Sequence, residues 1–101
     1  MILVSGFVRA EKLSERILGF SISEKGVIFQ VPTGGCTSKD SFSIESLETL
    51  PVQVHLIRNK SDLCKAYFPY GVKLEYTFEE LGLRSGEEFL IKNEFAKLRA
   101  R

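Results

Sequence analysis

The stretch VKLEYTF, residues 72–78, decides the fold class of this chain, because apolar and polar side chains alternate along it. The apolar members fall on one side of an extended backbone: Val72, Leu74, Tyr76 and Phe78. A period of two is typical of a strand that places one face against a core and the other in water. A sheet covered on one face only is antiparallel in most proteins, so the stretch predicts an antiparallel sheet.

The same alternation recurs on both sides of this stretch. Residues 16–32 predict a β-hairpin whose two strands are joined by the loop EKG at 24–26, where we expect Gly26 to supply a positive φ. Further strands are expected at 41–45, 52–58, 88–93 and, less regularly, 2–9, with a short extended piece at 67–68.

Helix is scarce in this pattern. One helical turn is expected near residues 79–83 (EELGL), closed by Gly82, and another turn within 11–16. About seven short strands separated by turn signals are typical of a sandwich or a barrel. The sequence therefore predicts an all-β protein, an antiparallel β-sandwich that forms a single domain over residues 1–101, with a small β-barrel as the alternative.

Composition limits the function classes. The chain has 101 residues, 44% of them hydrophobic, and a formal net charge of +1. A charge this small does not favour nucleic-acid binding, and no apolar run approaches the roughly 20 residues that span a bilayer. The opening apolar run at 2–4 is too short for the apolar part of a secretory leader. The chain is then either cytoplasmic or a mature domain whose leader has been removed.

The two cysteines, Cys36 and Cys64, both lie in predicted loops, 28 positions apart. A disulfide between them would stabilise a small domain by about 3–4 kcal/mol through the restriction of the unfolded chain. Two free thiols are an alternative. A reactive thiol is another, since Lys39 and Lys65 lie nearby in the sequence and a cation lowers a thiol pKa. We favour the disulfide, which persists mainly in oxidising compartments such as the periplasm or the exterior.

No catalytic residue, metal site or cofactor is predicted. Two cysteines and one histidine, without a CxxC spacing, fall short of the usual zinc ligand set. His55 shares a strand face with Gln53, opposite the apolar face, and is expected in a solvated or partly packed position. A Cys–His dyad is the one enzymatic arrangement that the chain permits.

The longest polar loop, residues 33–40, is the candidate recognition loop. Its residues are Thr33, Gly34, Gly35, Thr37, Ser38 and Lys39, around Cys36. It lacks the lysine position and the strand-to-helix setting of a phosphate-binding loop. An exposed loop fixed at Cys36 is suited to contact a partner, as inhibitor and recognition loops do.

The wider pattern resembles small immunoglobulin-like β-sandwich domains of bacterial exported proteins. The residues that carry the resemblance are Cys36, the segment Asp62-Leu63-Cys64 and the turn at 81–86, within residues 27–93. The resemblance implies a disulfide and an exported setting, and it implies no catalytic residue.

These observations predict a non-enzymatic binding or accessory module that presents a loop or a sheet face to a protein partner. Two alternatives stay open at this point: an inhibitor-like protein that uses the 33–40 loop, and a cysteine-dependent redox protein or enzyme. The expected location is periplasmic or secreted, with the cytoplasm as the alternative.

Overall fold

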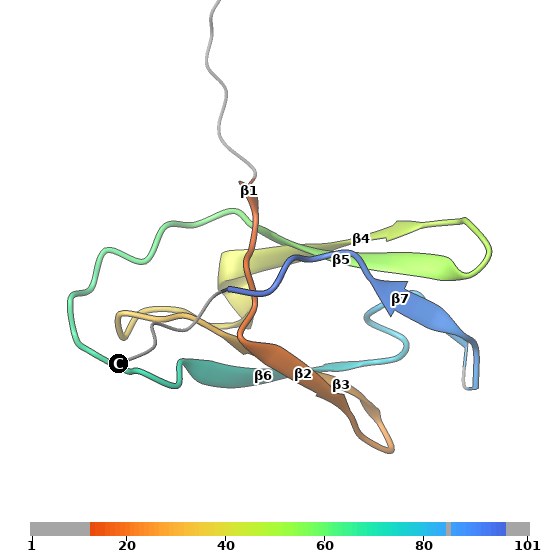
Figure 1. The fold of residues 1–101 in the computed structure, drawn as a ribbon, viewed down its shortest axis with the longest axis horizontal. Helices are drawn as coiled ribbons and strands as arrows, with labels where there is room; N and C mark the ends of the chain where they lie inside the picture. Colours follow the sequence, from red (N-terminus) through yellow and green to blue (C-terminus); the bar gives the residue numbers. More distant parts are fainter. Residues whose placement is uncertain (1–12, 85, 97–101) are drawn as a thin grey trace, which may run out of the picture.

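In the computed structural model, which describes residues 13–84 and 86–96, the chain forms two facing β-sheets (Figure 1). One sheet has β5 (Val52–Arg58) at its centre, paired with β1 (Leu13–Ser14), β4 (Phe42–Leu47) and β7 (Phe89–Ile91). The other has the order β2 (Gly19–Ile22), β3 (Gly26–Val31), β6 (Val72–Thr77). The predicted all-β sandwich of about seven strands is confirmed, and the described part contains no closed barrel.

The core lies between the two sheets and follows the alternation of the strands. Val27, Phe29 and Val31 of β3 are fully buried, and Phe29 is paired with Leu74 across the β3–β6 ladder. The Phe29 ring meets Tyr76 edge to face, with centroids 5.8 Å apart, which is a favourable geometry for aromatic pairs. The buried apolar set is Ile17, Val27, Phe29, Val31, Phe42, Val54, Leu56, Leu74, Tyr76, Leu81 and Leu83.

The hairpin predicted at 16–32 is formed by β2 and β3, but its glycine has a different role from the expected one. Gly26 is not among the glycines with positive φ; it is the buried first residue of β3. A Cβ atom there would lie 1.8 Å from the Tyr76 carbonyl oxygen on the neighbouring β6. Glycine is required at this position because two backbones approach closely.

Two strand assignments differ from the expectation. Leu13–Ser14 form strand β1, antiparallel to β5, where a helical turn within 11–16 was expected. β7 pairs with β5 in the parallel direction, so this sheet is mixed and not wholly antiparallel. No strand forms at 67–68, and the strand expected at 2–9 lies outside the described residues.

The helical turn expected at 79–83 is a hydrogen-bonded turn that does not continue into a helix. The Leu81 amide donates to the Thr77 carbonyl at 3.0 Å, and Gly82, with φ of 74°, ends the turn as expected. Within the described ranges, the one helical segment is the 3₁₀ turn η1 (Lys39–Ser41).

Asn93 joins the end of the chain to its beginning. Its buried side chain accepts from the Leu56 amide at 2.8 Å and donates to the carbonyl oxygens of Glu15 and Leu56, both at 2.7 Å. The amide group thus lies at the end of the short β1 ladder and supplies partners for the Leu56 amide and the Glu15 carbonyl, while the Leu56 carbonyl also accepts from the Glu15 amide at 3.2 Å.

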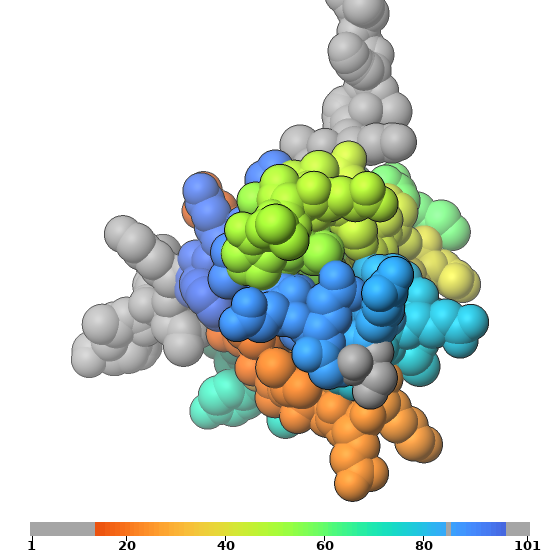
Figure 2. Space-filling model, turned by 90° about the vertical axis from the view of Figure 1, so that its right-hand side faces the viewer, coloured from red at the N-terminus to blue at the C-terminus, as the bar shows by residue number. Residues whose placement is uncertain are grey.

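The segment around β7 covers one end of the sandwich. Figure 2 shows it in blue between the β4–β5 hairpin, in yellow-green, and the β2–β3 hairpin, in orange. The opposite end carries the long connection from β5 to β6, which passes from one sheet to the other (Figure 1).

Candidate functional site

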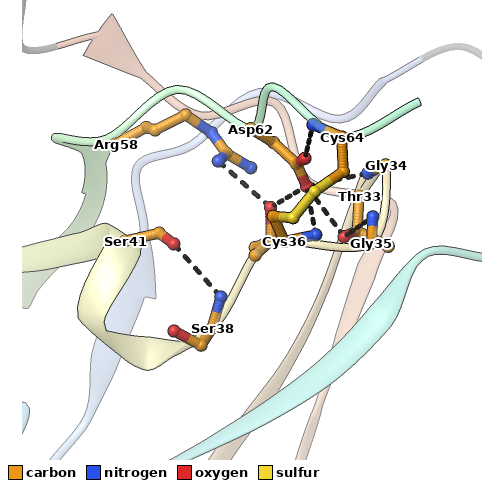
Figure 3. The surroundings of a disulfide bond; sticks show 10 residues. Thr33, Gly34, Gly35, Cys36, Ser38, Ser41, Arg58, Asp62 and Cys64 are labelled. Atoms are coloured by element: carbon orange, nitrogen blue, oxygen red, sulfur yellow. Dashed lines mark hydrogen bonds between the residues drawn. A yellow bond between two sulfur atoms is a disulfide. The ribbon is translucent and has the colours of Figure 1, made fainter. Parts of the chain in front are cut away.

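Cys36 and Cys64 form a disulfide that joins two long connections (Figure 3). Cys36 follows β3 of the three-stranded sheet, and Cys64 follows β5 of the other sheet. Their Cα atoms are 5.6 Å apart, which lies within the range usual for disulfides. The predicted cross-link is confirmed, and it bridges the segments that leave the two layers.

Asp62 is the polar centre of this region (Figure 3). Its carboxylate accepts five hydrogen bonds of 2.6–3.1 Å from backbone amides and hydroxyls. The donors are the hydroxyls of Thr33 and Thr37 and the amides of Gly34, Cys36 and Cys64. The carboxylate therefore orders the loop on both sides of the disulfide.

These donors change the protonation of Asp62. The hydrogen bond from the Thr37 hydroxyl, assisted by the three amides, holds the pKa of the carboxyl far below its usual value, against a partial desolvation that raises it. Donors that point at a carboxylate favour its charged form. Asp62 is accordingly an anion down to strongly acidic pH.

The glycine pair in the loop makes this close approach possible. A Cβ atom on Gly34 would lie 2.2 Å from the Cys64 carbonyl oxygen, and Gly35 has a φ of 113°. The Ala66 amide then donates to the Gly34 carbonyl at 2.9 Å. The sequence GGC therefore lets the two connections lie backbone to backbone beside the disulfide.

Arg58 connects this region to the sheet. Its guanidinium pairs with Glu15 at 2.8 Å, and both side chains are largely buried. It also donates to the Thr37 hydroxyl at 3.2 Å, and its carbon Cζ lies 4.6 Å from the centre of the Phe42 ring. The chain of contacts Glu15–Arg58–Thr37–Asp62 links the edge of β1 to the disulfide.

The polar groups of the candidate recognition loop are used within the molecule. Thr33 and Thr37 donate to Asp62, and the Thr33 hydroxyl also accepts from the Gly35 amide. The Ser38 amide donates to the Ser41 hydroxyl. Lys39 contacts both carboxylate oxygens of Glu80 and lies over the Tyr76 ring. The structure thus brings most of these residues together around Asp62.

The neighbouring connection carries the apolar surface that the sequence analysis did not identify. In residues 63–70, here called the aromatic loop, four large apolar side chains are exposed: Leu63 (82%), Phe68 (48%), Tyr67 (86%) and Tyr70 (76%). The loop is attached to the rest of the molecule at Cys64, and by hydrogen bonds from Ala66 to Gly34 and from Gln30 to Tyr70. The sequence signal was the run AYFPY between two turn segments.

His55 lies on the outer face of its sheet, as expected, and its ring nitrogens contact Glu45 and Ser14. Nδ1 is 3.4 Å from a Glu45 carboxylate oxygen, and Nε2 is 2.7 Å from the Ser14 hydroxyl. Both cysteines of the chain are in the disulfide, so neither forms with His55 the dyad that the sequence permitted. Sequence reasoning missed this group because Ser14 and His55 are 41 residues apart.

Within residues 13–84 and 86–96, one group has the composition of a metal site, namely Cys36, Asp62 and Cys64, whose ligand atoms lie within 4.8 Å of one another. The two sulfur atoms are bonded to each other, and the Asp62 oxygens already accept five hydrogen bonds. Cysteine binds a metal as the thiolate and a carboxylate binds it through free lone pairs, so the arrangement as folded does not suit a metal.

The chain matches no family model, no curated protein and no solved structure. No helix among the described residues has the length and the apolar character needed to cross a bilayer.

Proposed function

We propose that this protein is a binding module of an oxidising compartment, and that it engages a protein partner through the aromatic loop, residues 63–70. The observation that carries the proposal is the exposure of Leu63, Tyr67, Phe68 and Tyr70 on one short, covalently attached segment. Tyrosine and other aromatic side chains supply much of the binding energy at protein interfaces. Contiguous exposed apolar side chains on a small protein often mark such a site.

The attachment of the loop supports this function energetically. A loop that is already held by a disulfide loses less conformational entropy on binding than a free one. Asp62 and Cys64 hold the loop where it begins, and Gln30 holds it at Tyr70. The disulfide region is then a support for the aromatic loop and not itself the contact surface.

The charges beside the loop favour an acidic partner surface. Lys60, Lys65 and Lys73 are exposed in or next to the loop. The carboxylate of Asp62, the one acidic residue between positions 59 and 73, is directed at the 33–37 segment. We therefore propose a partner that offers an apolar pocket with acidic residues around it.

The inhibitor-like alternative, which uses residues 33–40, has weaker support because most polar groups of that loop bind Asp62 or Glu80. A thiol-dependent enzyme has weaker support as well, because both cysteines are in the disulfide.

The test is selection of phage-displayed peptides against the folded, oxidised protein. We expect peptides rich in aromatic, aliphatic and acidic residues, which bind at least about 10-fold more weakly to the variant Tyr67→Ser/Tyr70→Ser. The matched control is Leu50→Ser/Leu90→Ser, which removes two exposed apolar side chains outside the loop and should bind normally. Because all four positions are exposed, the unfolding midpoints of the two variants should stay close to that of the parent protein.

Two results would overturn the proposal. One is peptide binding that the loop variant and the control variant retain equally. The other is reversible dimerisation of the protein alone, detected by sedimentation and lost in Tyr67→Ser/Tyr70→Ser, which would identify a second copy as the occupant of the loop.

A further inference from the structure

Ser14, His55 and Glu45 form a line of three polar side chains across three neighbouring strands. Glu45 on β4 is directly opposite His55 on β5, and Ser14 on β1 is opposite Ile57, two residues further along β5. The three side chains share the outer face of the sheet, because Val54 and Leu56 point into the core. The three side chains are therefore positioned by paired strands and not by a flexible loop.

The hydrogen bonds define a consistent proton arrangement. With Nδ1–H donating to Glu45, Nε2 carries a lone pair directed at the Ser14 hydroxyl, which then donates to it at 2.7 Å. The His55 side chain is only 13% exposed, so its ring is held between its two partners. Ser14 itself is exposed. This is the order of a nucleophile, a base and a carboxylate that positions the base.

The surroundings of Ser14 leave space and a donor for a reacting group. Ser14 and Arg16 border an open hollow of about 550 Å³ that extends to Pro32 and Ser61. The Glu15 amide donates to Leu56 on β5, and the bonding residues of an antiparallel ladder alternate. The Ser14 amide therefore points away from β5, and we assign it the role of donor to an oxyanion formed at the Ser14 hydroxyl.

We propose that Ser14 is an activated nucleophile that accepts acyl groups from small, unhindered carboxylic esters. The Ser14 Oγ–acyl bond forms while the ester C–O bond breaks, and the hydroxyl proton passes through His55 Nε2 to the leaving alcohol. Water then releases the carboxylic acid by the same route and restores the serine. Glu45 acts as a positioning residue, because it holds the His55 tautomer and does not touch the ester.

The test uses a fluorophosphonate, which serine displaces at phosphorus with loss of fluoride, and 4-nitrophenyl acetate as the ester probe. We expect one phosphonyl group per chain, mapped by mass spectrometry to Ser14, together with 4-nitrophenolate release. Both should be lost in Ser14→Ala and fall about 100-fold in His55→Gln, as when a general base is removed. Glu45→Gln should fold, because Glu45 is exposed, and should show a smaller loss of both.

Ser43→Ala is the matched control, since Ser43 is opposite Ile57 on the other side of β5, is exposed, and is not one of the two hydrogen-bond partners of the His55 ring. Its labelling should equal that of the parent protein. Absence of labelling, labelling at another residue, or equal rates in the parent, His55→Gln and Glu45→Gln would each overturn the inference. None of these variants alters the aromatic loop, so the peptide selection tests the proposed function separately.

Discussion

Asp62 determines the order of the disulfide region, because its carboxylate is the common acceptor for donors from residues on both sides of the Cys36–Cys64 bond. A carboxylate placed in this way stabilises the fold only while it is ionised. Because the pKa of Asp62 is depressed in the folded state, the stability of the fold depends on pH in acid.

We expect Asp62→Asn to change how stability depends on acid. A carboxyl with a depressed pKa contributes stability that is complete above its unfolded value of about 3.9 and is lost as the pH falls toward its folded value. The parent protein should lose this contribution progressively below about pH 4, and Asp62→Asn should be less stable at pH 7 with a smaller loss below pH 4. Urea unfolding at several pH values measures this, and parallel curves for the two proteins would contradict it.

The Arg58–Glu15 ion pair leads to a second prediction about individual residues. Arg58→Met leaves Glu15 largely buried without its cation, which should cost about 3–5 kcal/mol of unfolding free energy. The double variant Arg58→Met/Glu15→Leu removes both charges and should recover most of that loss. Equal destabilisation of the single and the double variant would show that packing, and not the uncompensated charge, is what matters.

Among the strands, the close approach of β3 and β6 restricts position 26 to glycine. Gly26→Ala would place a methyl group against the Tyr76 carbonyl and should destabilise the protein by about 1–3 kcal/mol, as overpacking does. Gly19→Ala is the matched control in the neighbouring β2, because its nearest atom would be a side-chain oxygen 3.9 Å away. Thermal unfolding of the two variants distinguishes them, and equal midpoints would argue against the clash.

The hydrogen bonds of the Asn93 side chain are a second contact that joins elements of the fold. Asn93→Ala leaves the buried Leu56 amide and the part-buried Glu15 carbonyl without this partner, whereas the Leu56 carbonyl keeps its bond from the Glu15 amide. Each group left unsatisfied costs about 1–3 kcal/mol, so we expect a loss of several kcal/mol. Hydrogen exchange should show the loss first in the amides of Leu56 and Glu15, and uniform exchange across the sandwich would contradict this local role.

The alternation of apolar residues was sufficient to predict β3 and β6, because both strands have one face in the core. It was not sufficient for β1 or for the parallel β7, since a strand of two or three residues is too short to show an alternation. The partner of each strand is also distant in the sequence, so local sequence does not identify it. The role of Gly26 was missed for a related reason: its neighbour Tyr76 is 50 positions away and is known only once the register is known.

The candidate sites were predicted to different degrees. The disulfide could be inferred from two cysteines in loops, but not the carboxylate beside it, because four of the five donors to Asp62 are 25–29 positions away in the sequence. The Ser14–His55–Glu45 group depends on the order of three strands, which local sequence does not encode.

For the molecule as a whole, the Cys36–Cys64 bond is the one covalent link between the connections of the two sheets. We expect Cys36→Ala/Cys64→Ala to lower the unfolding free energy by about 3–4 kcal/mol, the amount expected for a 28-residue separation. Reduction of the parent protein by dithiothreitol should have the same effect in urea titrations and none on the double variant. A loss below about 1 kcal/mol would show that Asp62 and Arg58 hold the region without the bond.

The hydrogen bonds of Asn93 have a consequence for the order in which contacts form during folding. Residues 89–96 supply β7, the Asn93 amide group and the backbone partners of Ile17, and they complete the edge of β5 that lies opposite β4. Asn93 is 37 positions from Leu56 and 78 from Glu15, whereas β4 and β5 are neighbours in the sequence. Because closing a longer loop costs more entropy, we expect the β4–β5 hairpin to form early and the contacts of Asn93 to form later.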